Sequence, residues 1–422
     1  MNTRSEALRV LLGNWRGYNT VPAPDLYPHQ WSWDSAFIAI GTRHLSPLRA
    51  QRELESLFGA QWDDGRVPHI VFDPATPDEG YFPGPSFWNS KSVTGPGVAA
   101  TSGIVQPPVH ALAAWEVFQS DPDTAQRRRF LQRLYPKLVA WHEYLRCRRD
   151  LGGAGLVSIV HPWESGMDNS PAWDPALARV RPVSMRRYRR RDLDHADASQ
   201  RPTDEDYGRY VRLVETYRDS GYADRPEVHE FAVEDPLTNA LLAASEEAMA
   251  GIADEVGAPA APHLAELARL REAMVARLFS GGLFHPFDVR SGELTEVGSV
   301  AGLVPLVVPD LPVAEELIAT ATGPRFRAGE LGVVPSFDLT DERFDPARYW
   351  RGPAWFNIGW LIRRGLLTHG ASKLAEVLRS GYLEVAERAG FREYADPHRA
   401  TGLGAHRFAW TAALTLDLIE TR

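Results

Sequence analysis

A single cysteine, Cys147, is all that the chain of 422 residues offers for thiol chemistry. One cysteine cannot form a disulfide within the chain, and it cannot supply a cysteine-based zinc site. No run of eighteen apolar residues is present, so the sequence predicts no membrane-spanning helix. The N-terminal stretch also lacks an apolar core followed by a small-residue cleavage site, so we expect no signal peptide and a cytoplasmic protein.

Positive charge is in short supply. Lysine and arginine together number 46, against 55 aspartates and glutamates, which gives a formal net charge of -9. This balance argues against nucleic acid and against an anionic membrane surface as partners. If the substrate is itself an anion, the overall field of the protein does not attract it, and a local arginine has to bind it.

Apolar side chains, in contrast, are present in ordinary amounts. Hydrophobic residues make up 44% of the chain and charged residues 24%, which is typical of a soluble globular protein with a full core. A chain of 422 residues allows one large domain or two to three average ones. No stretch has the composition of a linker, so we expect a single domain over residues 1–422.

Helical periodicity recurs in segments of ten to twenty-odd residues. The twelve helices expected on this basis span residues 4–14, 34–43, 47–58, 106–119, 122–148, 234–253, 261–279, 298–306, 312–322, 351–367, 371–389 and 407–420. Strand signals are few and short, at 156–160, 283–286 and 333–337. Because the helices follow one another largely in pairs, we predict an all-α fold in which six helical hairpins close into an (α/α)6 barrel.

The long connections between these helices are expected to form one rim of the barrel. They span residues 15–33, 60–105, 149–178, 179–233, 323–350 and 390–406. Long connections in a compact domain are usually functional. Within them, the highly charged segment 179–206 is interpreted as a mobile flap over the site. An inert solvated loop, or a polyanion-binding patch around Arg186–Arg191, are the alternatives.

Aromatic side chains gather in these connections. Eight of the 13 tryptophans fall outside the expected helices, namely Trp31, Trp33, Trp62, Trp88, Trp163, Trp173, Trp350 and Trp355. An exposed loop is an unfavourable place for an indole ring unless the ring packs or binds something. Each ring taken alone can simply pack beneath its own loop. Eight together favour a sugar site, because the apolar faces of sugars stack on indole rings.

The loop 159–175, IVHPWESGMDNSPAWDP, combines aromatic rings, acids and stiff backbone. Its two prolines restrict the chain, and Gly166 permits a turn. A carboxyl group held beside an indole can keep its proton near neutral pH, so we interpret Asp168 as the proton donor of a glycoside-cleaving site. A second acid, Glu393, lies in a connection expected at the same rim, although it could be an ordinary surface acid. Two carboxylates across an aromatic cleft are the minimum equipment for glycoside hydrolysis.

Other polar residues of the connections are candidates for the same site. Asp34 could cap the helix that follows it, bind a sugar hydroxyl, or do both. His69 and Tyr81 stand in two Gly/Pro-stiffened loops and are candidates for the site wall. We expect His69 to be a hydrogen-bond donor, because no second His or Cys stands at metal-ligand spacing. Gln106, beside a helix start, could bind a sugar hydroxyl or be an ordinary loop amide.

Four blocks of sequence carry a resemblance to a known family. They are HQWSWDSAF at 29–37, WESGMDNSPAWD at 163–174, YWRGPAW at 349–355, and FREYADP at 391–397 followed by GLGAHRFAWTAAL at 402–414. In this order they resemble the bacterial members of glycoside hydrolase family 63, and in particular the mannosylglycerate and glucosylglycerate hydrolases. The resemblance covers nearly the whole chain.

This resemblance implies an (α/α)6 barrel and an inverting mechanism that uses neither metal nor cofactor. It implies that Asp168 is the general acid and Glu393 the general base, with the two carboxyl groups roughly 6.5–9.5 Å apart to leave room for a water molecule. Arg201 and Tyr207 resemble flap residues that grip the glycerate carboxylate. Positions that match or border the sugar pocket are Tyr27, Trp31, Trp33, Asp34, His69, Tyr81, Gln106, Trp163, Gly166, Trp350 and Trp355.

Three other functions remain open from the sequence. The first is hydrolysis of another short α-glucoside or a trehalose-like sugar. The second is sugar epimerisation on the same barrel, which needs a pair of facing histidines that the motifs lack. The third is sugar binding without catalysis, against which the presence of both acids argues. A gluco or manno preference and the state of a possible homo-oligomer are not readable from the sequence.

Overall fold

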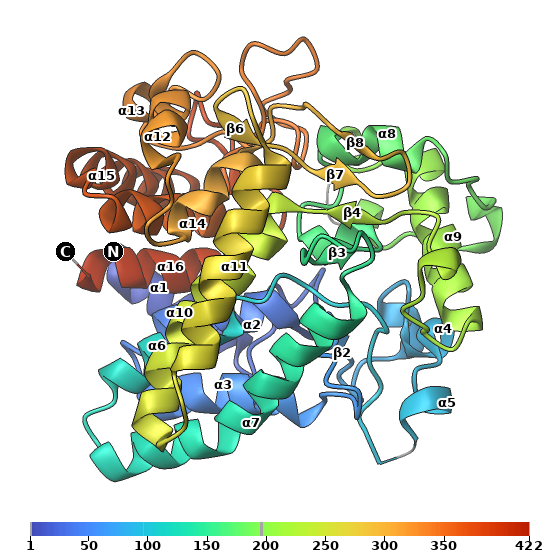
Figure 1. Ribbon diagram of the computed structural model, residues 1–422, viewed down its shortest axis with the longest axis horizontal. Coiled ribbons are helices and arrows are strands. Elements are labelled where there is room, and N and C mark those ends of the chain that lie inside the picture. Colours follow the sequence, from blue (N-terminus) through green and yellow to red (C-terminus); the bar gives the residue numbers. More distant parts are fainter. Residues whose placement is uncertain (1, 96, 195–196, 422) are drawn as a thin grey trace.

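Helices dominate the computed structural model, which describes residues 2–95, 97–194 and 197–421 (Figure 1). Every segment that we expected to be helical contains a helix. Eleven are α-helices: α1 Thr3–Asn14, α2 Ser32–Thr42, α3 Pro47–Gly59, α6 His110–Ser120, α7 Thr124–Arg148, α10 Pro236–Val256, α11 Ala261–Leu278, α12 Ala314–Thr322, α14 Phe356–Thr368, α15 Ser372–Ala389 and α16 Ala409–Glu420. The remaining one, η8 Val300–Val307, is a 3-10 helix.

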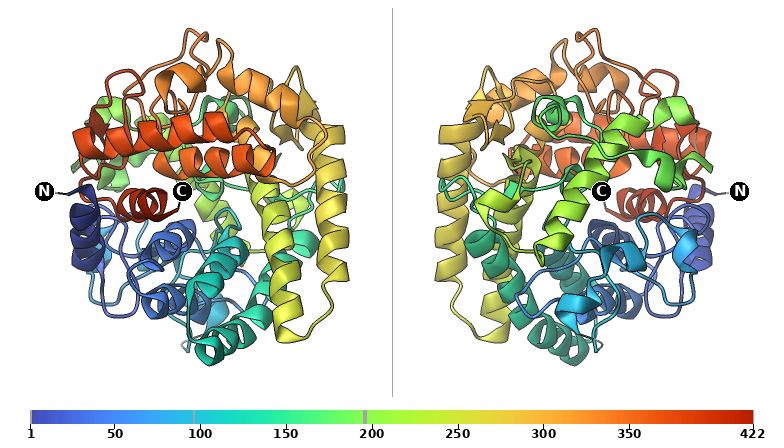
Figure 2. Two further views of the ribbon diagram at one scale, coloured as in Figure 1. Left: turned by 90° about the vertical axis from the view of Figure 1, so that its left-hand side faces the viewer. Right: turned by 90° about the vertical axis from the view of Figure 1, so that its right-hand side faces the viewer.

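Two concentric rings of helices build the barrel. Contacts run from α2 to α6, α10, η8, α14 and α16, and α16 returns to α2, so these six form a closed inner ring. Each inner helix packs against an outer one, namely α3, α7, α11, α12, α15 or α1. Figure 2 shows α16 next to the N-terminal helices, where the ring closes. The expected (α/α)6 barrel is therefore confirmed.

Small and apolar side chains allow the helices of the inner ring to pack closely against one another. Every residue of α2 is buried. A Cβ atom added to Gly41 of this helix would lie 2.0 Å from the backbone oxygen of Ala413 in α16, so the two helix backbones are in direct contact. Local signals mark the start of α10 and the end of α15. Asp235 accepts a hydrogen bond from Thr238 N at 2.9 Å at the start of α10, and Gly390, with φ +66°, follows α15.

Short strands shape the connections. The expected strands at 156–160 and 283–286 contain β3 Ser158–Ile159 and β6 Leu283–Phe284. Segment 333–337 is not a strand and makes only two isolated bridges. One antiparallel sheet has the order β3-β4-β7-β8, with β4 Val233–Glu234, β7 Phe287–Asp288 and β8 Glu293–Leu294. The other pairs are β1 Gln30–Trp31 with β2 Ile70–Val71, β5 Phe279–Ser280 with β6, and β9 Tyr394–Ala395 with β10 Gly402–Leu403.

One long helix was not expected. α9, Asp204–Asp219, lies within the connection 179–233, and Figure 1 shows it beside β3 and β4 at the edge of the molecule. A capping box between Thr203 and Asp206 starts it, and its buried face is largely tyrosine and valine. Shorter helices in the connections are α4 Pro85–Trp88, α5 Lys91–Thr94, α8 Asp174–Leu177, α13 Ala328–Leu331, and the 3-10 turns η1 Asp78–Gly80, η2 Pro162–Ser165, η3 Pro171–Trp173, η4 Met185–Arg187, η5 Asp192–Asp194, η6 Ala198–Gln200 and η7 Pro226–Val228.

Three expectations about helix starts are wrong in detail. The helix expected from 106 begins at His110, because the prolines at 107 and 108 disfavour the helical conformation of the residues before them. The helix expected from 351 begins only at Phe356, after Pro353. Asp34 does not cap α2, because the helix already begins at Ser32. No helix in the described part of the chain is long and apolar enough to cross a membrane.

Candidate active site

Two adjoining cavities open among the long connections. The first has a volume of about 490 Å³ and is lined by both candidate catalytic acids together with most of the predicted sugar-pocket residues. The second, about 430 Å³, shares Tyr27, Tyr81, Trp163 and Asp168 with the first, and adds Arg201 and Tyr207. The structure thus brings all fifteen residues singled out from the sequence to this pair of cavities: Tyr27, Trp31, Trp33, Asp34, His69, Tyr81, Gln106, Trp163, Gly166, Asp168, Arg201, Tyr207, Trp350, Trp355 and Glu393.

Eight further lining residues escaped the sequence analysis. In the first cavity these are Pro22, Tyr349, Phe408 and Trp410, and in the second Leu26, Phe82, Asp192 and Pro202, with Tyr349 in both. Tyr349 is the first residue of the motif YWRGPAW but was not assigned to the site, and its φ of +40° turns the chain there. Trp410 falls within an expected helix, where an aromatic side chain usually belongs to the core. Asp192 stands in a charged segment that carries no periodic signal.

Glu393 is a buried acid with several hydrogen-bond donors. Tyr27 Oη donates to its Oε1 at 3.0 Å, while the backbone N of Ala405 and Arg201 Nη2 donate to its Oε2 at 2.9 and 3.3 Å. The β9–β10 pair returns the chain toward Glu393. Gly404, with φ +70°, completes this return, and a Cβ atom there would lie 2.5 Å from Glu393 Oε2. Both oxygens of Glu393 are therefore held by hydrogen bonds from the surrounding connections.

Asp168 follows a tight turn at Gly166. Gly166 has φ +69°, and a Cβ atom on it would lie 2.3 Å from the ring of Trp33, so no other residue fits without rearrangement. Tyr210 Oη donates to the backbone oxygen of Asp168 at 2.9 Å, and Tyr349 Oη approaches its Oδ2 at 3.4 Å. These two tyrosines therefore help to fix the loop, and Asp168 lines the cavity.

The environment of Asp168 favours its protonated form. Burial is the main cause, and together with the negative charge of Glu393 it raises the pKa of Asp168 to about 7, against the opposing effect of Arg201. Asp34, in the first turn of α2, is also affected. Burial raises its pKa well above the usual range, and the charges of Glu393 and Asp168 add to this shift. Burial therefore favours the protonated form of both aspartates in this cavity.

Aromatic rings form the walls. Trp31 meets Tyr27 and Tyr81 edge to face, with ring centroids 5.3 and 5.2 Å apart, and Trp350 and Trp355 stack at 3.7 Å. Five of the eight loop tryptophans line the cavity. The other three, Trp62, Trp88 and Trp173, are buried in a second apolar cluster beneath the loops, so for these the simple packing alternative is correct.

The two remaining polar candidates support the scaffold as well as lining the cavity. Gln106 Oε1 accepts a hydrogen bond from Trp33 N at 3.1 Å, which satisfies a backbone donor in the first turn of α2. His69 Nδ1 lies 3.1 Å from Ser102 Oγ, and burial lowers its pKa well below the usual value, so the ring is neutral. His69 also stacks on Trp163, with ring centroids 6.2 Å apart.

Segment 179–206 supplies a buried cation. Arg201 is only 4% exposed and lies with its guanidinium 4.5 Å from the ring centre of Tyr349. Its Nη1 is 3.2 Å from Tyr27 Oη, and its Nε has no hydrogen-bond partner among the described residues. The guanidinium is therefore close to the two acids and has a donor to spare.

The other arginines of the segment differ from Arg201. Arg189 and Arg191 both pair with Asp194, and Arg190 pairs with Asp192. Their charges are matched locally by the acids that follow them in sequence. These three arginines therefore do not favour the polyanion-binding alternative, whereas Arg186 and Arg187 are exposed and leave it untested.

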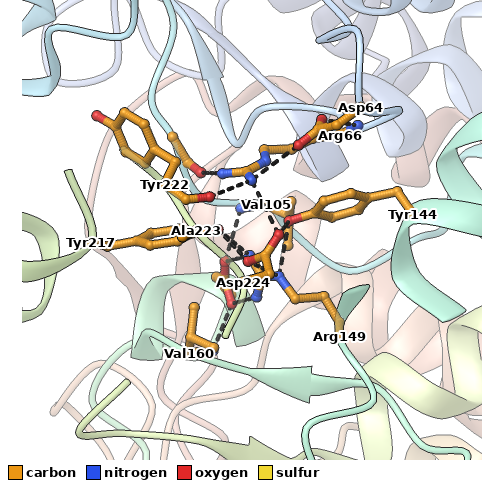
Figure 3. A network of polar contacts seen from close by, with 12 residues as sticks. Asp64, Arg66, Val105, Tyr144, Arg149, Val160, Tyr217, Tyr222, Ala223 and Asp224 are labelled. Atoms are coloured by element: carbon orange, nitrogen blue, oxygen red, sulfur yellow. Dashed lines mark hydrogen bonds and ion pairs between the residues drawn. The ribbon is translucent and has the colours of Figure 1, made fainter. Parts of the chain in front are cut away.

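A buried polar network supports the site loops from behind (Figure 3). Arg149, which ends α7, donates from Nη1 and Nη2 to Glu164 Oε2 and Oε1 at 2.8 and 2.7 Å. The same carboxylate accepts the backbone N–H groups of Val105 and Val160 at 3.1 and 2.7 Å. Both Arg149 and Glu164 are completely buried. One ion pair thus joins the segment of Gln106 to the loop of Asp168.

Arg66 extends this network to the segment of His69. Its Nη1 donates to Gly103 O at 2.6 Å, and its Nη2 lies 3.2 Å from Asp224 Oδ2. Asp224 in turn lies 3.0 Å from Arg149 Nε. Figure 3 shows Tyr144, Tyr217 and Tyr222 around these charges. Three connections that carry site residues therefore share one charged cluster.

Replacing Glu164 by alanine should destabilise the fold strongly. The variant leaves Arg149 buried with one carboxylate fewer and two backbone N–H groups unpaired, so we expect a loss of about 3–5 kcal/mol in the free energy of unfolding, measured in urea. Glu384→Ala is the control, because Glu384 pairs with Arg388 on the surface, with 64% and 59% of the two side chains exposed. It should cost less than about 1 kcal/mol. Similar losses in the two variants would contradict a structural role for the network.

Comparison with known proteins agrees with this geometry. A family profile described as mannosylglycerate hydrolase MGH1-like glycoside hydrolase domain matches residues 27–411. A mannosylglycerate hydrolase of Rubrobacter radiotolerans is 40% identical over 98% of this chain and 96% of its own length. A glucosylglycerate hydrolase of Mycolicibacterium hassiacum is 37% identical over the same shares, 98% and 96%.

Solved structures give the same result. The GH63 mannosylglycerate hydrolase of Thermus thermophilus in complex with Tris and D-glycerate covers 100% of both chains with 39% identity and a TM-score of 0.91. The neutral trehalase of Saccharomyces cerevisiae, 14% identical with a TM-score of 0.60, shares the fold alone. From these matches and the fold, the chain belongs to the mannosylglycerate hydrolase MGH1-like family of glycoside hydrolases, within glycoside hydrolase family 63.

Proposed function

We propose that the protein hydrolyses an α-linked glycosylglycerate with inversion at the anomeric carbon, using Asp168 as general acid and Glu393 as general base. The observation that carries this proposal is the difference between the two acids of one cavity. Burial raises the pKa of Asp168 to about 7, so a large share of it carries a proton at neutral pH. Glu393 instead accepts hydrogen bonds from Tyr27, Ala405 and Arg201.

The proposed reaction needs one proton donor and one proton acceptor. Asp168 donates its proton to the glycosidic oxygen as the bond between this oxygen and the anomeric carbon breaks. A water molecule attacks the anomeric carbon from the opposite face, and Glu393 takes a proton from it. Sugar and glycerate leave, and a proton exchange restores both carboxyl groups. Room for the water molecule requires the separation of roughly 6.5–9.5 Å that is typical of inverting enzymes.

Arg201 is the proposed binding group for the glycerate carboxylate. It lines the second cavity, and a guanidinium is the group that binds a carboxylate through charge-assisted hydrogen bonds. The relatives are named mannosylglycerate and glucosylglycerate hydrolases, and one solved relative was obtained with D-glycerate. We infer that segment 179–206 acts as a flap that carries this arginine, within a single catalytic domain.

Removing either acid should abolish turnover without abolishing binding. Asp168→Asn and Glu393→Gln are each expected to lower kcat by about 10²- to 10⁴-fold, because each removes a proton-transfer step. Single-turnover hydrolysis of mannosylglycerate and glucosylglycerate measures the rate, and calorimetry measures the affinity. Asp174→Asn is the control, since Asp174 lies in the same loop but pairs with Arg351 near the surface. A near-normal rate in either catalytic variant would refute its assigned role.

The rate should depend on the protonation of Asp168. Because the protonated form is the reactive one, kcat/KM is expected to fall about tenfold per pH unit above the pKa of Asp168, which is about 7. Steady-state kinetics between about pH 5 and pH 9 measure this fall in kcat/KM. A profile that stays flat above neutral pH would contradict Asp168 as the acid.

Arg201→Ala should lower kcat/KM more for a glycerate-bearing substrate than for a neutral one. The variant loses contact with Glu393 as well, so some loss of rate is expected for every substrate. We expect the additional loss in kcat/KM for the glycosylglycerate, relative to an uncharged α-glycoside, to be about 10- to 100-fold. Arg186→Ala, an exposed arginine of the same segment, is the control. Equal losses on both substrates would remove the proposed grip on the carboxylate.

A further inference from the structure

The second cavity contains a negative charge that the proposed reaction does not use. Asp192 lines this cavity together with Arg201 and Tyr207. Its side chain is 17% exposed. Burial is the main cause of the raised pKa of Tyr207 and Tyr81, and the charge of Asp192 adds to both shifts. The carboxylate of Asp192 therefore acts on the space that the aglycone would occupy.

The cation that pairs with Asp192 does not line that space. Arg190 donates to Asp192 from Nε and Nη2 at 3.1 and 2.6 Å, and from Nη1 to Asp204 at 3.0 Å. Its guanidinium stacks on Tyr207, 4.5 Å from the ring centre. Among the described residues that line the cavity, Arg201 is the only arginine or lysine. Arg201 can thus pair with one anionic group of a bound aglycone in this cavity.

We propose that Asp192 determines the specificity for the aglycone, accepting a hydrogen bond from its free hydroxyl group and rejecting aglycones that carry a second negative charge there. This inference rests on the proposed function, because it places the glycerate in the second cavity with its carboxylate at Arg201. Glycerate has one carboxylate and two hydroxyl groups, and the glycosidic bond uses one of the hydroxyls. The other is a donor of the kind that a carboxylate binds.

Small changes in the aglycone separate these two effects. In lactate, a methyl group replaces the terminal hydroxymethyl group of glycerate, so the donor is lost without a new charge. In tartronate, a carboxylate replaces it, so a second negative charge faces Asp192. Arg190 already pairs with Asp192 from outside the cavity, so the second carboxylate of tartronate would bring a negative charge that has no cation of its own, which is unfavourable in a partly buried site. The wild-type protein should therefore bind D-glycerate best, D-lactate less well and tartronate least.

Isothermal titration calorimetry of the full chain with these three acids tests the inference. Asp192→Asn keeps the size of the side chain but removes its charge. The ratio of the dissociation constants for tartronate and D-glycerate should fall about tenfold or more in this variant. Asp204→Asn is the matched control, because it removes the other carboxylate that pairs with Arg190 but does not line the cavity, and its side chain is 73% exposed. It should leave the ratio within about twofold of the wild type.

Two outcomes would overturn the inference, one by removing the role of Asp192 alone and the other by removing the proposed function as well. If wild-type protein binds D-glycerate but the ratio is unchanged in Asp192→Asn, or changes equally in Asp204→Asn, only the role of Asp192 fails. If D-glycerate does not bind to the wild type at all, and neither glycosylglycerate is hydrolysed, the proposed function fails and this inference with it. A fall in the ratio that is specific to Asp192→Asn supports it.

Discussion

The cleft depends on positive partners for its buried carboxylates. Behind it Glu164 faces Arg149, and within it Glu393 faces Arg201. Burying a carboxylate without such a partner lowers the stability of the fold by several kcal/mol, unless the group takes up a proton. Asp168 makes no ion pair among the described residues, and burial raises its pKa to about 7. The two acids of the cleft thus differ in their surroundings, since Glu393 has a cationic partner and Asp168 has none among the described residues.

The barrel makes this arrangement possible because it separates stability from function. The inner ring of α2, α6, α10, η8, α14 and α16 packs through buried apolar and small residues. The connections at one end of it are then free to carry polar groups. They are not loose, because the Arg149–Glu164 pair and its neighbours join three of them into one network (Figure 3). A rigid set of loops is what pre-organised acid–base chemistry needs.

Much of this could be predicted from the sequence, for identifiable reasons. The ring helices have a strong 3.6-residue period, and the motif residues Trp31, Asp168 and Glu393 stand in long connections that contain prolines and glycines. α9 escapes prediction because its charged start resembles a solvated loop, and because its tyrosines pack on other connections and not on the ring. Asp192 escapes it for a related reason. Its partner Arg190 is fixed by Asp204 and by the ring of Tyr207, both well separated in sequence, which no local pattern reveals.

The central claim is that Asp168 and Glu393 act as acid and base on opposite faces of the sugar, and the anomeric form of the first product tests it most directly. Proton NMR, recorded while the purified protein hydrolyses an α-linked glycosylglycerate, resolves the two anomers before they equilibrate. We expect the free sugar to appear first as the β-anomer. If the α-anomer appears first, the reaction retains configuration, and Glu393 would have to act as a nucleophile instead of a base.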